Sequence, residues 1–241
     1  MSEDYLALML HTRGRRCLVV GGGEVARRKV EDALHAGLAV VVVAPRVVPA
    51  LRDLARLGRI TWEERVFHPA DVRGMFLTFA AATPEVNDQA CQAARQAGVL
   101  VNVVDHPEMS DFISPAVLQR GPVTVAVSTG GASPALAARI RDRVATVVDE
   151  ETGEWATLLA RFRRRVQEAV AEAGVRHELL RRAAELEGEA AIARGERTAV
   201  ERLLDSWLEP YRPASRHPGG GASGEEREDG GGGGPARQSA R

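Results

Sequence analysis

The chain has 241 residues and a mass of 25.9 kDa, which is enough for one or two domains with a sizeable hydrophobic core. Its net charge of -1 and its pI of about 6.6 argue against a generic nucleic-acid binder, which would carry a domain-wide positive excess. No stretch reaches the roughly 18 apolar residues of a membrane span. The two cysteines, Cys17 and Cys91, lack the spacing of metal ligands, so we expect free thiols, no preformed metal site and a soluble cytoplasmic protein.

The N-terminal part contains a strand, a glycine turn and a helix in succession. Residues 17–20 are a short apolar run that leads directly into Gly21, Gly22 and Gly23, and a helical pattern begins at Val25. Gly21 permits a sharp turn, and Gly23 lets the backbone approach a pyrophosphate at the start of the helix. This pattern predicts a dinucleotide site, with an ordinary glycine turn as the alternative.

Strands and helices then alternate along the chain. After a helix over 26–35, which Gly37 closes, the apolar periodicity predicts strands over 39–43, 60–65, 76–81 and 99–104 and helices over 49–57 and 85–96. Alternating strands and helices are typical of an α/β protein of the Rossmann type, with a doubly wound parallel sheet covered on both faces.

The pattern changes after Val104. Residues 123–127 alternate as one added strand, and Ser133 and Pro134 are suited to begin a helix over about 135–148. One strand and one helix cannot bury their apolar faces alone, so we predict an arm that pairs with a second copy in a homodimer. The region 155–208 is helical in composition, and the glycine-rich end of the chain predicts disorder.

These patterns divide the chain into four parts. We predict a nucleotide-binding Rossmann domain over residues 1–113, a dimerisation arm over 114–150, a helical domain over 151–212 and a disordered tail over 213–241.

The end of the second strand bears on the choice of nucleotide. A Rossmann domain that binds NAD usually places an acid about 20 residues after the glycines. Here the strand ends in Ala44, Pro45 and Arg46. Arg46 could accept the 2′-phosphate of NADP or could be a solvated loop residue, so the residues alone leave NAD and NADP open.

Ligands of open α/β sheets bind outside the carboxyl ends of the strands. Thr83, Asn102 and Asp105 fall at such ends. Asp105 either caps a loop or is a carboxylate beside the nicotinamide that removes a proton as hydride leaves. His106 is either a surface loop residue or a titrating group. Ser128 precedes a turn and a helix start, where free amides could receive a substrate carboxylate.

Several linked motifs resemble one known family. They are Val19–Lys29, Val42–Pro45, Ala80–Thr83 with Val86 and Asn87, Val101–Asp105, Asp111–Ala116 and Ser128–Pro134. Their order and spacing resemble those of precorrin-2 dehydrogenases, which form the dehydrogenase module of siroheme synthases. Some members of that family are also sirohydrochlorin ferrochelatases. The resemblance covers about residues 5–148.

The resemblance implies NAD-dependent oxidation of precorrin-2 to sirohydrochlorin by a homodimer, on the route to siroheme or cobalamin. Asp105 matches the family's catalytic aspartate, and Ser128 matches a serine near the tetrapyrrole site. Glu24, Val25, Pro45 and Arg46 fall where the family contacts NAD, which favours NAD as the cofactor. Together with Gly21, Gly22, Gly23 and Thr83, they make up the predicted cofactor site.

The tetrapyrrole substrate is fringed with acetates and propionates, so its site needs cations and amide donors. We expect substrate contacts from Asn102, His106, Ser128, Arg120 and Arg139. Two alternatives stay open: a bifunctional enzyme that also inserts iron into sirohydrochlorin, and a non-catalytic module that senses NAD.

Overall fold

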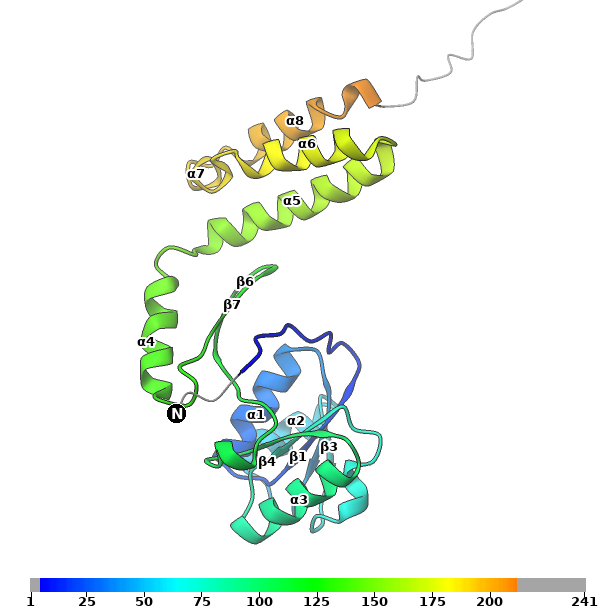
Figure 1. Ribbon diagram of the computed structural model, residues 1–241, viewed down its shortest axis with the longest axis vertical. Coiled ribbons are helices and arrows are strands. Elements are labelled where there is room, and N and C mark those ends of the chain that lie inside the picture. Colours follow the sequence, from blue (N-terminus) through cyan, green and yellow to red (C-terminus); the bar gives the residue numbers. More distant parts are fainter. Residues whose placement is uncertain (1–4, 212–241) are drawn as a thin grey trace, which may run out of the picture. The chain divides into compact units, whose positions relative to one another are not determined.

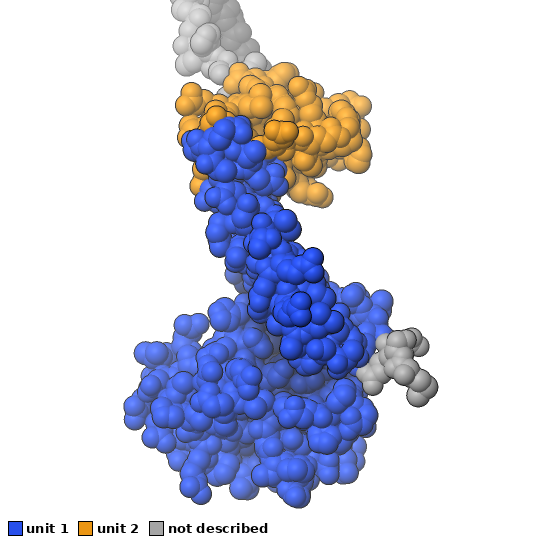
Figure 2. Space-filling view, turned by 90° about the vertical axis from the view of Figure 1, so that its left-hand side faces the viewer, with its two compact units in different colours: residues 1–158, 188–195 blue, residues 159–187, 196–241 orange. Residues whose placement is uncertain are grey.

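The computed structural model describes residues 5–211, so the predicted tail over 213–241 lies outside the described residues. The chain divides into two compact units, residues 1–158 with 188–195 and residues 159–187 with 196–241 (Figure 2). None of the helices between residues 5 and 211 has the length and apolar character needed to cross a membrane.

The first unit is built on a five-stranded parallel sheet with the strand order β3-β2-β1-β4-β5. The strands are β1 (Arg16–Val20), β2 (Ala39–Val43), β3 (Thr61–Glu63), β4 (Leu77–Ala80) and β5 (Leu100–Val103). This arrangement confirms the predicted Rossmann-type parallel sheet. Strand β2 has the predicted bounds, whereas β3, β4 and β5 are two or three residues shorter than predicted.

Helices cover both faces of this sheet (Figure 1). They are α1 (Glu24–His35), α2 (Pro49–Arg56) and α3 (Pro84–Gln96). Successive side chains of β1 point to opposite faces, so Cys17 and Val19 join one apolar cluster, whereas Leu18 and Val20 join the other. The first cluster contains residues of α1 and α2, and the second contains residues of α3.

The register of the sheet brings three strand ends together. Val20 of β1 lies opposite Val43 of β2 and Ala80 of β4. The loops that follow these three strands therefore meet at one edge of the sheet, which is where an open α/β sheet binds its ligands.

The segment after the parallel sheet forms a hairpin of two strands, β6 (Ala116–Arg120) and β7 (Val123–Val127), which pair antiparallel. The expectation of a single added strand is therefore wrong. A tight turn at Gly121, whose φ is +51°, folds residues 116–120 back onto β7. The partner strand escaped the sequence analysis because its short run of Ala, Val, Leu, Gln and Arg alternates only weakly.

Helix α4 (Pro134–Val144) follows the hairpin, and its start agrees with the prediction. The Ser133 hydroxyl accepts a hydrogen bond from the Leu136 amide at 3.2 Å, and Pro134 occupies the first turn. The helix ends four residues earlier than predicted, and Asp149 caps the next helix, which begins at Glu150. The Asp149 carboxylate accepts a hydrogen bond from the Thr152 amide at 2.8 Å.

The remaining helices are α5 (Glu150–Ala169), α6 (Ala173–Ala184), α7 (Gly188–Ala193) and α8 (Arg197–Ser206). The second unit contains α6, α8 and the part of α5 from residue 159 onward. The Phe162 ring meets the Trp207 ring edge-on at 6.2 Å, and the Arg182 guanidinium lies 4.3 Å from the Trp207 ring centre. These contacts hold α5, α6 and the end of α8 together.

Both cysteines are free and buried, with exposed fractions of 0% for Cys17 and 2% for Cys91. Burial raises the pKa of the Cys17 thiol to about 12, so this group stays protonated and unreactive at pH 8. We expect Ellman's reagent to label neither thiol of the native protein at pH 8 within minutes, and to label two thiols after denaturation. Rapid stoichiometric labelling of the native protein would contradict this packing.

Candidate functional site

The glycine turn between β1 and α1 is tight because two of its glycines touch neighbouring backbone. A Cβ atom at Gly21 would lie 2.1 Å from the Ala81 carbonyl oxygen, and one at Gly22 would lie 2.0 Å from the Arg46 carbonyl oxygen. Gly21 also has φ +118°, which strongly favours glycine. These two glycines are therefore required by the fold itself.

Gly23 differs from the other two glycines. It is the N-cap of α1, its φ of -85° suits any residue, and a Cβ atom added there would meet nothing within 4 Å. The structure thus leaves open space at the start of α1, where helix amides lack intrahelical partners and attract phosphate. Glu24 follows, and its charge is offset by an ion pair of 2.6 Å to Arg27. This arrangement fits the pyrophosphate of a dinucleotide.

The other predicted cofactor residues lie at the same edge of the sheet. Pro45 and Arg46 follow β2, and Thr83 follows β4 as the N-cap of α3. All three are exposed. The Gly21 amide donates to the Val43 carbonyl at 3.0 Å, which ties the glycine turn to the end of β2.

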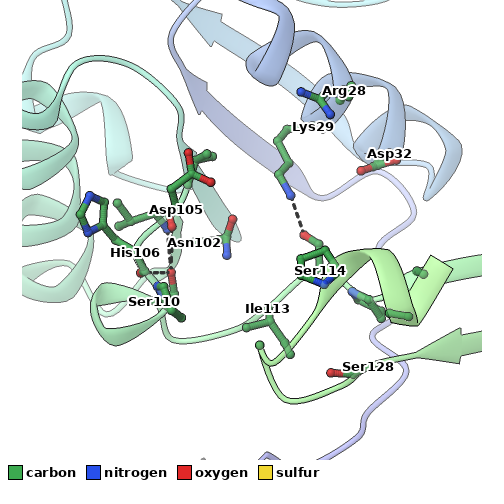
Figure 3. A pocket seen from close by; sticks show the side chains of 18 of the residues that line it. Arg28, Lys29, Asp32, Asn102, Asp105, His106, Ser110, Ile113, Ser114 and Ser128 are labelled. Atoms are coloured by element: carbon green, nitrogen blue, oxygen red, sulfur yellow. Dashed lines mark hydrogen bonds between the residues drawn. The ribbon is translucent and has the colours of Figure 1, made fainter. Parts of the chain in front are cut away.

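A cavity of about 690 Å³ lies in the first unit, beside the end of β5. Its walls come from α1, the loop after β5, the segment leading into β6 and the end of β7 (Figure 3). Of the predicted site residues, it contains Val25, Asn102, Asp105, His106 and Ser128. Residues far apart in the sequence thus meet in one cavity.

Asp105 occupies a strained position in this cavity. Its φ is +62°, and it is the only non-glycine residue among residues 5–211 with a positive φ. Aspartate tolerates this region better than most residues, yet backbone strain of this kind concentrates at functional sites. The structure therefore holds an exposed carboxylate at the carboxyl end of β5.

Ser110 holds the loop that carries Asp105. Its hydroxyl accepts from the Val103 amide and donates to the His106 carbonyl, each at 2.9 Å. The side-chain amide of the buried Asn102 donates to the Phe112 carbonyl at 2.9 Å. Asn102 therefore ties the loop to β5. The sequence analysis missed Ser110, because a serine in a polar loop carries no periodic signal.

His106 points its ring toward a neighbouring acid. Its Nδ1 lies 2.9 Å from the Glu108 carboxylate, and this hydrogen bond lowers the pKa of Glu108. The His106 side chain is thus tied to its own loop while it lines the cavity.

Ser128 reaches the cavity from the end of β7. Its hydroxyl accepts a hydrogen bond from the Gly130 amide at 3.1 Å. Ser128 is exposed, and it enters the cavity from a different element than Asp105 does (Figure 3).

Helix α1 contributes three charged residues that the sequence analysis did not select. Arg28, Lys29 and Asp32 line the cavity together with Val25. The Lys29 ammonium donates to the Ser114 hydroxyl at 3.0 Å. Helical spacing contained the signal, since residues three, four and seven positions after Val25 share its face of the helix.

The two arginines predicted to contact substrate do not line this cavity. Arg120 lies at the opposite end of β6 from Ala116, which does line it, and its Nε is 3.3 Å from the Glu150 carboxylate. Arg139 is exposed on α4. Within one chain, neither arginine side chain lines the cavity that contains Asp105.

The described residues 5–211 contain no group of three or more histidine, cysteine, aspartate or glutamate side chains able to hold a metal ion.

Comparison with known proteins shows which families this chain resembles. Residues 8–116 match the family described as "Putative NAD(P)-binding", and residues 120–146 match the one described as "Sirohaem biosynthesis protein central". The siroheme synthase of Methylococcus capsulatus is 43% identical over 218 residues. The chain is therefore similar to one part of the siroheme synthases. The alignment with that relative covers 88% of this chain and 46% of the relative.

A second siroheme synthase gives a similar alignment. The siroheme synthase of Nitrosococcus oceani is 38% identical over 209 residues, which cover 86% of this chain and 44% of that protein. The chain therefore spans less than half the length of these siroheme synthases. A solved structure of a precorrin-2 dehydrogenase, SirC, has the same fold, with a TM-score of 0.68 and 24% identity over 84% of this chain and 100% of that one.

Proposed function

We propose that this siroheme synthase relative oxidises precorrin-2 to sirohydrochlorin with NAD, within siroheme or cobalamin biosynthesis. The main observation behind the proposal is that helix α1 contributes to two neighbouring sites. Its first turn, at Gly23 and Glu24, offers open space for a pyrophosphate, while Val25 and Lys29 line the cavity that contains Asp105. A dinucleotide and a second ligand would therefore meet along one helix.

NAD, when bound, supplies the hydride acceptor for this reaction. Gly23, Glu24 and Val25 would hold its pyrophosphate at the start of α1, and the loops with Pro45, Arg46 and Thr83 would hold its adenosine half. Gly21 and Gly22 permit the close packing of those loops. NADH and one proton leave together with each product molecule, which balances the two-electron oxidation.

Asp105 would accept the proton that the substrate loses as a ring C–H bond breaks and its hydride departs. The exposed carboxylate stands in the cavity, on a loop held by Ser110. Asn102 keeps β5 and this loop in register, and His106 and Ser128 would contact the acidic periphery of the tetrapyrrole. Within one chain, Arg120 and Arg139 lie outside this cavity, so we propose them as contacts only at its outer margin or in a dimer.

The test is anaerobic incubation of the purified protein with precorrin-2 and NAD, with NADP in a parallel reaction. We expect NADH absorbance and the sirohydrochlorin spectrum to appear together and in equal amounts. Tight NAD binding with no turnover would instead favour a nucleotide-sensing module. Faster turnover with NADP would reassign Arg46 to a 2′-phosphate.

We propose that residues 114–150, which include the hairpin β6–β7 and α4, form a dimerisation arm. A two-stranded hairpin is marginally stable by itself, and this arm exposes Val117 by 48%, Leu136 by 44% and Val147 by 73%. We expect light scattering during gel filtration to give a mass of twice 25.9 kDa. Val117→Lys should shift that mass toward the monomer, and a monomeric wild-type protein would refute the proposed arm.

The same proposal places the enzyme in the cytoplasm. Its two buried free thiols are compatible with a reducing compartment.

A further inference from the structure

Lys29 is the only lysine among the 32 lysine and arginine residues of the chain. It lies on α1 and lines the cavity that contains Asp105 (Figure 3). Its ammonium donates to the Ser114 hydroxyl at 3.0 Å and lies 5.4 Å from the centre of the Phe79 ring. A hydroxyl and an aromatic face thus hold this cation at the wall of the cavity.

The ammonium lacks a matching anion within the described part of the chain. An ammonium has three hydrogen-bond donors, and Ser114 uses one of them. No carboxylate of residues 5–211 lies within ion-pair distance of Lys29. Burial lowers the pKa of Lys29, while the nearby charges of Asp32 and Asp105 oppose that change and Arg28 adds to it. A half-buried cation of this kind gains most from an anion that enters the cavity.

We propose that Lys29 binds a carboxylate of the substrate and that Ser114 holds its ammonium in place. This inference rests on the proposed function, because precorrin-2 carries acetate and propionate groups. An anion held by Lys29 would anchor the tetrapyrrole beside Asp105. Lys29 is thus a substrate-binding residue that supplies a cation where, within one chain, Arg120 and Arg139 do not.

The position of Lys29 on α1 separates this role from cofactor binding. Lys29 follows Glu24 by five residues, which is about 7.5 Å along the helix axis. The pyrophosphate belongs at the helix start, whereas the Lys29 ammonium contacts the segment that leads into β6. Loss of the ammonium should therefore leave NAD affinity unchanged.

The kinetic test uses Lys29→Met, which removes the charge and keeps the length of the side chain. We expect KM for precorrin-2 to rise about tenfold, with kcat and the Kd for NAD within about twofold of wild type. The KM of Lys29→Arg should lie between those of wild type and Lys29→Met, because a guanidinium keeps the charge but is a broader group. Arg56→Met is the matched control, since it removes one exposed positive charge on α2 and should change none of these three constants.

A binding test uses the single lysine directly. Reductive ¹³C-methylation of the full chain labels only Lys29 and the N-terminal amine, and it preserves the positive charge. We expect anaerobic addition of sirohydrochlorin to shift the Lys29 methyl resonance and leave the N-terminal resonance unchanged. Lys29→Met should raise the Kd for sirohydrochlorin by about tenfold.

The outcomes separate this inference from the proposed function. If Lys29→Met has the same kcat and the same KM as wild type, the role of Lys29 is overturned and the dehydrogenase proposal is unaffected. A shifted Lys29 resonance without any NADH would support the carboxylate site and refute the dehydrogenase. Loss of NAD affinity in Lys29→Met would assign the cation to the cofactor instead and overturn the inference. If the wild-type protein shows no turnover and no shifted Lys29 resonance, both the dehydrogenase and the role of Lys29 are overturned.

Discussion

Replacement of Asp105 by asparagine is expected to lower kcat for precorrin-2 oxidation by about 100- to 10,000-fold, which is the usual contribution of a general base. Asparagine keeps the size of the side chain and tolerates the left-handed backbone that φ +62° requires. It removes only the carboxylate that would accept the proton. The assay is the anaerobic coupled appearance of NADH and sirohydrochlorin.

Two further substitutions at Asp105 separate chemistry from backbone strain. Asp105→Gly removes the carboxylate but adopts a positive φ freely, so its free energy of unfolding should stay within about 1 kcal/mol of wild type. Alanine lacks the short polar side chain that helps aspartate and asparagine adopt the left-handed conformation. The free energy of unfolding of Asp105→Ala should therefore fall by about 1–2 kcal/mol. Thermal unfolding distinguishes the two. Asp105→Asn with kcat within threefold of wild type would rule out the carboxylate as the proton acceptor.

The second large effect is expected at Gly23. Alanine there should raise the Kd for NAD about 100-fold, because its methyl group would occupy the open space in which a pyrophosphate approaches the start of α1. The protein itself should tolerate the change, since φ is -85° and a Cβ meets no atom within 4 Å. We expect the free energy of unfolding to change by less than about 1 kcal/mol.

Gly21→Ala provides the contrast in the same turn. Its Cβ would collide with the Ala81 carbonyl oxygen at 2.1 Å, and its φ of +118° is unsuited to alanine. We expect a loss of more than about 3 kcal/mol of stability, visible as a lower melting temperature by circular dichroism. Calorimetric titration of Gly23→Ala with NAD completes the comparison. Unchanged NAD affinity in Gly23→Ala would move the cofactor away from this turn.

The parallel sheet could be predicted from the sequence because its signals are local. Uninterrupted apolar runs such as 39–43 mark strands buried on both faces, and Gly37 and Gly98 mark helix ends with positive φ. The cap at Ser133 was also predictable, since a serine before a proline at a helix start satisfies a free amide locally. The strand over residues 116–120 was not, because its evidence is a pairing partner across a turn.

The candidate site was predictable only in part. Asp105 could be selected because carboxyl ends of parallel strands face the ligand edge of a sheet. The positions of Arg120 and Arg139 could not be inferred, since the direction of β6 decides which of its ends faces the cavity. At about 3.3 Å per residue, Arg120 lies about 13 Å along the strand from Ala116. Lys29 was missed because α1 was assigned to the cofactor alone.

The sequence by itself determined the order of strands and helices, the glycine turn and the aspartate after β5, since each depends on residues that are neighbours along the chain. Only the tertiary structure decided which glycine leaves room for a ligand, because close approach depends on the carbonyls of Ala81 and Arg46, which lie in the loops after β4 and β2. It also decided that Lys29 and Ser114, 85 residues apart, meet beside Asp105. Long-range packing sets such contacts, and no local pattern encodes them.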